Sequence, residues 1–255
     1  MRKVILLLAV LSLIVFMSSC QKREEVTVTK YFQAMQANDR DTMSSMAYEP
    51  KDIVFKSYEI LSIDEPVVEE LGLAGLLKKK AELEKQQRDL GNDYLDKADE
   101  LAEAEYDLEE TRRSSTRAQL KKKIDELNTE VETLKESIKT LQKEINENKN
   151  AINREKDLIT MNTGMRDNLE MFSGETSITK VTVKVTLEND EVNDYIFILR
   201  EDTLKLQDRQ TKGRLIIVTL MTADEYEQSM KAPEPTEEVT EEEPVTQEET
   251  TEETG

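Results

Sequence analysis

The sequence predicts an α+β protein, in which a small roll of helices and antiparallel strands is interrupted by an antiparallel helical hairpin. Three observations lead to this prediction. Strand patterns occur in two separate segments, residues 20–64 and 171–230. Residues 65–170 between them repeat apolar side chains with helical spacing and contain no strand pattern. Residues 231–255 are strongly acidic and have too few apolar residues to form a core, so we expect a disordered tail.

The composition excludes several classes of site. The chain of 255 residues has 55 acidic and 35 basic residues, a formal charge of −20, one cysteine, and neither histidine nor tryptophan. It therefore has no site that needs histidine, no disulfide within one chain and no zinc site of the usual cysteine and histidine types. Glycine-rich phosphate-binding motifs are absent, and the acidic balance argues against nucleic acid as a partner. We expect no enzymatic activity and no cofactor.

The N-terminus has the pattern of a secretion signal. Arg2 and Lys3 precede an apolar run, residues 4–17, which is shorter than the ~20 residues of a membrane-spanning helix. The segment Met17-Ser18-Ser19-Cys20 follows and resembles the lipobox of bacterial lipoproteins. The alternative is an uncleaved anchor with an incidental cysteine.

The lipobox resemblance has consequences for location. It implies that residues 1–19 are a signal peptide and that Cys20 becomes the acylated first residue. Several acyl chains then anchor the protein stably in a membrane. Gln21 after the cysteine resembles the sorting pattern for the outer membrane, so we expect a position there, facing the periplasm.

Residues 20–64 are predicted to form two short helices and a strand, the first part of the roll. One helical face is made by four residues with i, i+3, i+4, i+7 spacing: Val28, Tyr31, Phe32 and Met35. A break at Asn38 separates this helix from a second one, which Pro50 ends. Residues 53–63 are rich in β-branched and aromatic side chains and indicate the strand.

Residues 65–170 carry a strong coiled-coil pattern in their second half. Apolar residues repeat there with alternating spacings of four and three: Leu120, Ile124, Leu127, Val131, Leu134, Ile138, Leu141 and Ile145. Asn148, Ile152, Glu155 and Ile159 continue the same frame. The helix before them has a patchier stripe, interrupted by Lys80, Gln87 and Lys97, and the frame changes phase near residues 111–116. Thr116 and Gln119 have capping-box spacing, so a new helix is expected to start there.

We therefore expect the helix to fold back near residue 114. An unbroken rod would be about 150 Å long and would separate two flanking pieces that are each too small to hold a core. The antiparallel alternative pairs the two stripes in register: Leu108 with Leu120, Leu101 with Leu127, Tyr94 with Leu134, Leu90 with Ile138, Leu83 with Ile145, and Leu76 with Ile152. Lys80 then faces Asn148. A parallel dimer of two chains competes with this hairpin, and the coiled coil is expected to bind a protein partner or a second copy.

Residues 171–230 complete the roll with three predicted strands. Val181, Val183, Val185 and Leu187 alternate with polar residues, as in a half-buried strand. Residues 195–199 and 215–221 form the second and third strands, the latter after a turn at Lys212-Gly213.

The flanking pieces resemble a known family. The helix with Tyr31-Phe32 and Asn38-Asp39, followed by strands that end in residues 212–218 (KGRLIIV), is similar to the nuclear-transport-factor-like (cystatin-type) α+β roll of many small bacterial lipoproteins. The resemblance implies a cone-shaped pocket. Family members that are enzymes use histidine there, so no catalytic residue carries over to this chain. Adaptor proteins of efflux pumps also carry a helical hairpin, but their flanking sequence signatures are not found here.

Residues 111–123 combine six basic residues with no acidic one. They are Arg112, Arg113, Arg117, Lys121, Lys122 and Lys123. The fold-back places them at the tip of the hairpin, and we call them the basic tip. They are expected to touch an anionic surface of the envelope, such as lipid head groups, an acidic polymer or an acidic partner. The alternative is an exposed turn without a partner.

Together these features predict a lipid-anchored protein of the bacterial cell envelope that projects a coiled-coil hairpin to bind or space a partner. The alternative from another class is a small-ligand-binding or sensing lipoprotein that uses the pocket of the roll. No metal site is predicted, since the acidic clusters lack the spacing of a calcium loop.

Overall fold

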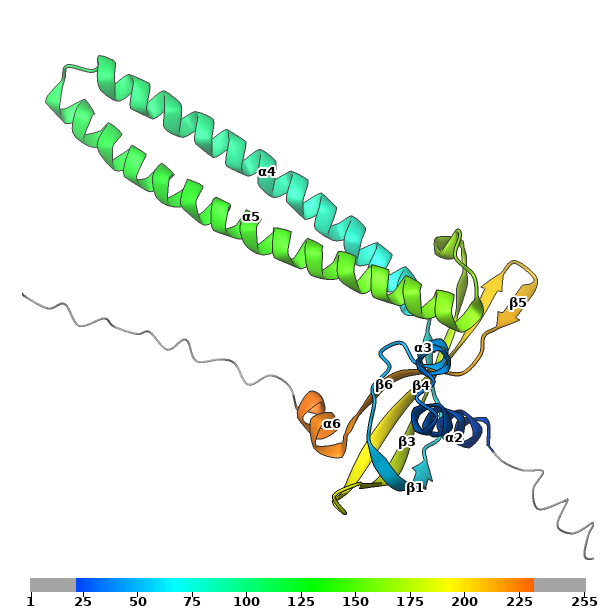
Figure 1. The fold of residues 1–255 in the computed structure, drawn as a ribbon. Helices are drawn as coiled ribbons and strands as arrows, with labels where there is room; N and C mark the ends of the chain where they lie inside the picture. Colours follow the sequence, from blue (N-terminus) through cyan, green and yellow to red (C-terminus); the bar gives the residue numbers. More distant parts are fainter. Residues whose placement is uncertain (1–21, 232–255) are drawn as a thin grey trace, which may run out of the picture.

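The computed structural model describes residues 22–231, and it confirms the predicted α+β class. A curled antiparallel sheet with two short helices forms a body, from which a long helical hairpin projects (Figure 1). The predicted signal peptide, Cys20 and the predicted tail beyond Lys231 lie outside the described residues.

The chain begins with the predicted pair of helices, α2 (Arg23–Gln36) and α3 (Arg40–Met46). The predicted face of α2 is buried. The turn between the helices needs a positive φ of 53° at Asn38, a conformation that asparagine tolerates better than most residues. Asp39 then caps α3, because its carboxylate accepts a hydrogen bond from the backbone N–H of Thr42 at 3.0 Å.

Two long strands form the centre of the sheet, β3 (Ser173–Leu187) and β4 (Val192–Leu206), paired with each other in antiparallel fashion. On the free edge of β3 lie β1 (Phe55–Ile63) and β2 (Val67–Glu70). On the free edge of β4 lie β5 (Arg209–Lys212) and β6 (Ile216–Thr222). A short helix, α6 (Ala223–Met230), follows β6.

The core of the body lies between α2 and the sheet. It joins the buried face of α2 to Val181, Val183 and Val185 of β3 and to Phe197 and Leu199 of β4. Aromatic rings fill its centre, and Phe32 stacks on Tyr58 with 4.1 Å between the ring centroids. The burial of such large side chains supplies most of the stability of the body.

The hairpin is inserted between neighbouring strands of one sheet. Its helices are α4 (Gly72–Glu110) and α5 (Ser114–Thr163). Val67 before the hairpin lies opposite Ile178 after it in the β2–β3 pairing. The chain therefore reverses between the two helices, as the change of heptad phase predicts, and the flanking segments share one body.

The coiled-coil frame is confirmed residue by residue in α5. From Leu120 to Asn148 every residue of the predicted frame is buried or half-buried, and all other residues are exposed. The register also agrees with the predicted pairs. Gln87 donates to Gln142 at 3.0 Å, and Lys97 lies 3.1 Å from Glu130. The amide of Asn148 donates to the carbonyl of Leu76 at 3.2 Å, and this carbonyl points along α4 toward residue 80.

Several details differ from the prediction. Lys80 does not bond Asn148 but lies 3.7 Å from Glu84 of its own helix. The expected capping box at Thr116 does not form, because α5 begins two residues earlier, at Ser114. Strand β2 was not predicted; the β-branched pair Val67-Val68 extends the sheet before α4 begins at Gly72. Strand β5 and helix α6 were also missed, and β3 and β4 are longer than their apolar stretches indicate.

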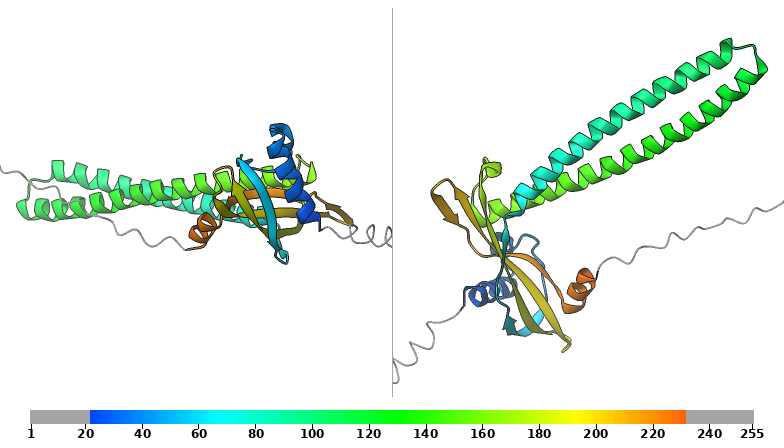
Figure 2. Two further views of the ribbon diagram at one scale, coloured as in Figure 1. Left: turned by 60° about the horizontal axis from the view of Figure 1, so that its bottom comes forward. Right: turned by 180° about the vertical axis from the view of Figure 1, so that it is seen from behind.

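The hairpin points away from the start of the described chain. At 1.5 Å per residue, the 39 residues of α4 extend ~58 Å. Figures 1 and 2 show the tip of the hairpin and the N-terminal end of α2 on opposite sides of the body.

Candidate functional site

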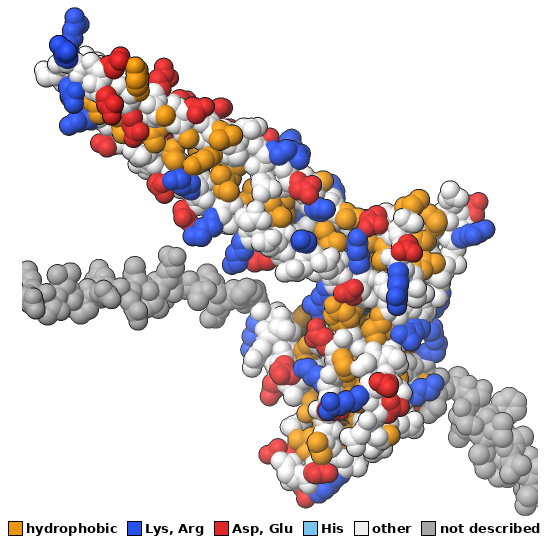
Figure 3. Space-filling view, turned by 45° about the horizontal axis from the view of Figure 1, so that its top comes forward, with side chains coloured by type: hydrophobic (Ala, Val, Ile, Leu, Met, Phe, Trp, Pro, Cys, Tyr) orange, Lys and Arg blue, Asp and Glu red, His pale blue; other side chains and the backbone are white. Residues whose placement is uncertain are grey.

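The structure gathers the six basic residues at the far end of the hairpin, as predicted. Arg112 and Arg113 lie in the three-residue linker between the helices, and Arg117 and the three lysines lie in the first turns of α5. All six are exposed. Figure 3 shows basic side chains gathered at this end of the molecule.

Arg117 differs from the other five, because it has a structural role. Its guanidinium donates to the backbone carbonyls of Leu108 at 3.0 Å and Thr111 at 2.9 Å. These contacts satisfy carbonyls that the end of α4 leaves without a partner in the helix. Arg117 therefore helps to close the hairpin.

The remaining basic residues of the tip are largely unpaired. Lys122 lies 3.4 Å from Glu126, one turn further along α5. Within residues 22–231 the structure gives no acidic partner to the other four, which are Arg112, Arg113, Lys121 and Lys123.

Several charges at the tip are placed unfavourably with respect to the dipoles of α4 and α5. The positive end of a helix dipole attracts acidic residues and its negative end attracts basic ones, each by ~0.3–1 kcal/mol. Here α4 ends with Glu109 and Glu110, and α5 starts with a basic N-cap, Arg113, and no acidic residue in its first turn. The helix dipoles therefore do not explain the acidic end of α4 or the basic start of α5.

A second cluster, which the sequence analysis missed, joins the hairpin to the sheet. We call it the polar junction. Arg200 of β4 donates from both terminal nitrogens to Glu155 of α5, at 2.7 and 2.8 Å. Its Nε donates to Asp202 at 2.8 Å, and the same Asp202 oxygen accepts from Thr176 of β3 at 2.9 Å.

Asn162 of α5 completes the polar junction from the helix side. Its amide donates to the carbonyl of Arg200 and its oxygen accepts from the N–H of Asp202, both at 3.0 Å. A Cβ at position 213 would lie only 1.6 Å from that oxygen, so Gly213 is required for this close approach.

Burial and ion pairing oppose each other in the electrostatics of the polar junction. It raises the pKa of Asp202 above its usual value, although hydrogen bonds and the charge of Arg200 oppose the shift. For Arg200, burial lowers the pKa, but the bonds to Glu155 and Asp202 outweigh it, so the net shift is upward. The second carboxylate oxygen of Asp202, Oδ2, is buried without a hydrogen-bond partner. The sequence signal for this cluster was Glu155, a charged residue at a position of the heptad frame that is otherwise mostly apolar.

The concave side of the roll is filled rather than hollow, because the apolar core occupies it. A shallow depression of about 340 Å³ lies beside α2 and the start of β1, lined among others by Gln36, Asn38, Asp52 and Glu188. Depressions of similar size lie beside α3 and beside the start of α2, so the surface offers a ligand of the roll, the alternative function, no single point of entry.

Between residues 22 and 231, no helix combines the length and apolar character needed to cross a membrane. The same residues contain no group of histidine, cysteine and carboxylate side chains that could hold a metal ion.

Comparison of the chain with family models, with curated proteins and with solved structures finds no match. The resemblances to bacterial lipoproteins and to the nuclear-transport-factor-like roll therefore stay predictions from the residues that carry them.

Proposed function

We propose that this chain is a lipid-anchored protein of the bacterial cell envelope, which projects a coiled-coil hairpin to contact an anionic surface. Its role is that of a binding or spacing element and not of an enzyme. The observation that carries the proposal is the position of the basic tip, at the end of a ~58 Å hairpin that points away from the start of α2.

The anchor follows from the sequence around Cys20. Only two residues separate this cysteine from Arg23, the first residue of α2. A lipid on Cys20 would therefore hold the body against the membrane, and the hairpin would extend from its other side. Outer-membrane sorting by Gln21 would direct the hairpin into the periplasm.

The tip is suited to contact because most of its charge, Arg117 excepted, has no evident structural purpose. Four of its basic residues have no acidic partner in the described chain, and the dipoles of both helices disfavour the charges that flank the linker. Attraction between such a cluster and an anionic surface acts over ~8 Å at physiological salt and weakens as salt rises.

The filled core supports the scaffold proposal over ligand binding by the roll. Ligand pockets are usually enclosed and lined by apolar side chains with a few polar ones. In this roll the apolar side chains pack against each other.

The anchor is tested by metabolic labelling with a palmitate analogue in a bacterial host. The wild-type chain is expected to carry the label and to sediment with membranes, and Cys20→Ala is expected to lose both properties. Membrane association of Cys20→Ala without label would contradict the lipid anchor and support an uncleaved N-terminal helix.

The tip is tested with isolated envelope membranes at low and at high salt. Changing Arg112, Arg113 and Lys123 to Ser is expected to remove the salt-sensitive part of binding while Arg117 still closes the hairpin. Changing Lys78, Lys79 and Lys85 to Ser, three basic residues near the base of α4, is the matched control. Equal binding by the two variants would contradict a role of the tip.

A further inference from the structure

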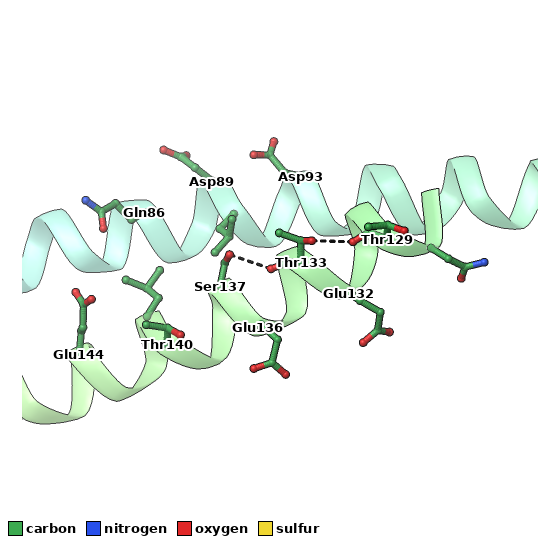
Figure 4. A pocket seen from close by; sticks show the side chains of 13 residues that line it. Gln86, Asp89, Asp93, Thr129, Glu132, Thr133, Glu136, Ser137, Thr140 and Glu144 are labelled. Carbon is green, nitrogen blue, oxygen red and sulfur yellow. Dashed lines mark hydrogen bonds between the residues drawn. The ribbon is translucent and has the colours of Figure 1, made fainter. Parts of the chain in front are cut away.

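One face of the hairpin carries an acidic groove between α4 and α5, and Figure 4 shows part of it. Three leucines that are at least half-buried lie in it: Leu90, Leu134 and Leu141. Nine carboxylates and one lysine line it: Asp89, Asp93, Asp96, Glu100, Glu126, Glu130, Glu132, Glu136, Glu144 and Lys97. We call this feature the acidic groove.

Basic neighbours on the hairpin compensate only part of this charge. Five of the nine carboxylates pair with lysines, for example Glu130 with Lys97 at 3.1 Å. The structure of residues 22–231 gives no basic partner to Asp89, Asp93, Asp96 and Glu144. The first three follow one another along α4 with i, i+4, i+7 spacing, so they form a line on one side of that helix.

Small hydroxyl side chains of α5 line the groove between the two rows of carboxylates. The hydroxyl groups of Thr133 and Ser137 donate to carbonyls one turn earlier in α5, at 2.8 and 2.9 Å (Figure 4). Their small side chains leave space above the seam in which longer side chains of another molecule could lie.

Lys123 of the basic tip continues the same face of the hairpin. Residues seven positions apart lie on one side of a coiled-coil helix, and Lys123 precedes Glu130, Ser137 and Glu144 at this spacing. The face is therefore acidic over its middle and basic at its end. Such a strip is complementary to a second copy of itself that runs in the opposite direction.

We propose that the hairpins of two copies associate in antiparallel orientation, with the basic tip of each in the acidic groove of the other. This inference deepens the proposed function, because it names the anionic surface that the tip contacts. The two bodies of an antiparallel pair lie at opposite ends, so two copies anchored in the same membrane form it only when their hairpins lie along that membrane and not upright on it.

The distance between the tip and the groove along the hairpin is compatible with one two-fold axis that relates the two copies. Asp93, near the middle of the groove, lies ~26 Å from the end of α4 at 1.5 Å per residue. Two hairpins that overlap by about 30 Å place both tips on both grooves at once. With coils ~20 Å wide, the overlap buries on the order of 1,200 Å² in total, which lies at the low end for specific interfaces. The two bodies lie beyond opposite ends of the overlap, so their negative charges stay far apart compared with the Debye length of ~8 Å.

A second copy would cover both the basic tip and the acidic groove, whereas any other partner would cover only one of them. Anionic lipid or an acidic polymer would neutralise the basic tip and leave the acidic groove uncovered. A cationic helix of another protein would fill the groove and leave the tip unpaired. The chain itself supplies both charges at the required separation.

The test is photo-crosslinking of the full chain in the producing cells. A photoreactive residue replaces the exposed Ser115 of the tip, and crosslinked products are separated by mass and mapped by peptide sequencing. We expect a product of twice the chain mass, with the crosslink in residues 86–100 or 126–144 of the second copy.

Charge reversal then identifies the surfaces. Changing Asp89, Asp93 and Asp96 to Lys is expected to lower the crosslinked dimer at least tenfold. Changing Arg112, Arg113 and Lys123 to Glu in the same chain is expected to restore it. The matched control changes Glu84, Asp99 and Glu105 of α4 to Lys, which alters the net charge equally but outside the groove, and is expected to retain the dimer. Circular dichroism checks that each variant keeps its helices.

Three outcomes would overturn the inference. They are the absence of a dimer product, a crosslink to lipid, polymer or another protein in place of a second copy, and a dimer that survives reversal of the groove but is lost in Leu95→Glu on α4. The last outcome would assign the contact to exposed Leu95, which does not line the groove. A crosslink to another molecule would leave the proposed function intact, so the two proposals fail separately.

Discussion

The body and the hairpin bury apolar surface in different ways. In the body, large side chains such as Phe32, Phe197 and Leu199 are completely enclosed between a sheet and a helix. In the hairpin, only two narrow stripes of side chains pack against each other, and many of these side chains, such as Leu134 and Ile138, are only half-buried. The body is therefore expected to provide most of the stability, and the hairpin to provide reach and surface charge.

The polar junction connects these two regions. A substitution that breaks it is expected to have the largest effect on the free energy of unfolding. Replacing Arg200 by Met removes the positive charge that Glu155 and Asp202 share while both carboxylates stay buried. Breaking a buried ion pair on one side typically costs ~3–5 kcal/mol. We expect a loss of this size in the free energy of unfolding, measured by urea denaturation with circular dichroism.

The control for this prediction is Arg214→Met, which removes an exposed arginine that bonds backbone carbonyls near the same end of α5. Its effect is expected to stay below ~1.5 kcal/mol. Equal effects of the two variants would mean that the polar junction adds nothing beyond ordinary hydrogen bonds.

Truncation of one leucine in each region measures the difference in burial. Leu199→Ala removes a fully enclosed side chain of the body and is expected to cost ~2–5 kcal/mol. Leu134→Ala removes a half-buried side chain of the seam, where solvent fills the space, and is expected to cost ~1–2 kcal/mol. Urea denaturation of both variants gives the comparison, and a larger loss for Leu134→Ala would reverse the roles assigned to the two regions.

Asn148 is a polar residue among the apolar side chains that pack between α4 and α5. Its side chain is buried, one amide hydrogen bonds the carbonyl of Leu76, and its oxygen has no partner. Asn148→Leu is expected to raise the free energy of unfolding by ~1 kcal/mol, since a buried unsatisfied oxygen is removed and the branched shape of the side chain is kept. Asn148→Asp, which adds a buried charge, should instead destabilise the hairpin. Thermal unfolding distinguishes the two outcomes, and a destabilised Leu variant would show that the amide is needed to fix the register.

The sequence predicts the hairpin more completely than the contacts that join it to the body, for a physical reason. The hairpin follows from a local period, and the seam positions from Leu120 to Asn148 can be read directly from it. The fully buried faces of α2 and of the later half of β3 also show their period. The polar junction has no period, because residues distant in sequence, such as Glu155 and Arg200, meet only after the chain has reversed.

The same cause explains which strands were shortened or missed. The first half of β3 carries Thr176 where a core strand would have an apolar residue, since this buried side chain bonds Asp202 in the polar junction. Strand β5 consists of Arg209–Lys212, four polar residues paired only with the end of β4. In both cases tertiary contacts override the local preference.

The smallest predicted effect is a change in the pH dependence of stability at Asp202. Burial raises the pKa of this carboxyl in the folded chain, and its free oxygen Oδ2 can take up a proton without losing a hydrogen bond. The folded state therefore binds this proton more tightly than the unfolded state does. The resulting stabilisation is complete below the unfolded pKa of about 3.8 and is lost as the pH rises through the higher folded pKa.

Asp202→Asn removes this titration, so the stability of the variant relative to the wild type should increase as the pH rises across that window. The slope of the difference cannot exceed that of one proton, ~1.4 kcal/mol per pH unit. Urea denaturation of both chains at a series of pH values from 4 to 7 measures it, and carboxylates common to both chains cancel in the comparison. If the two stability curves run parallel, Asp202 keeps the same charge in the folded and unfolded chain. The Arg200 ion pairs would then compensate its burial completely, and the junction would resemble the exposed ion pairs of the hairpin more than the interior of the body.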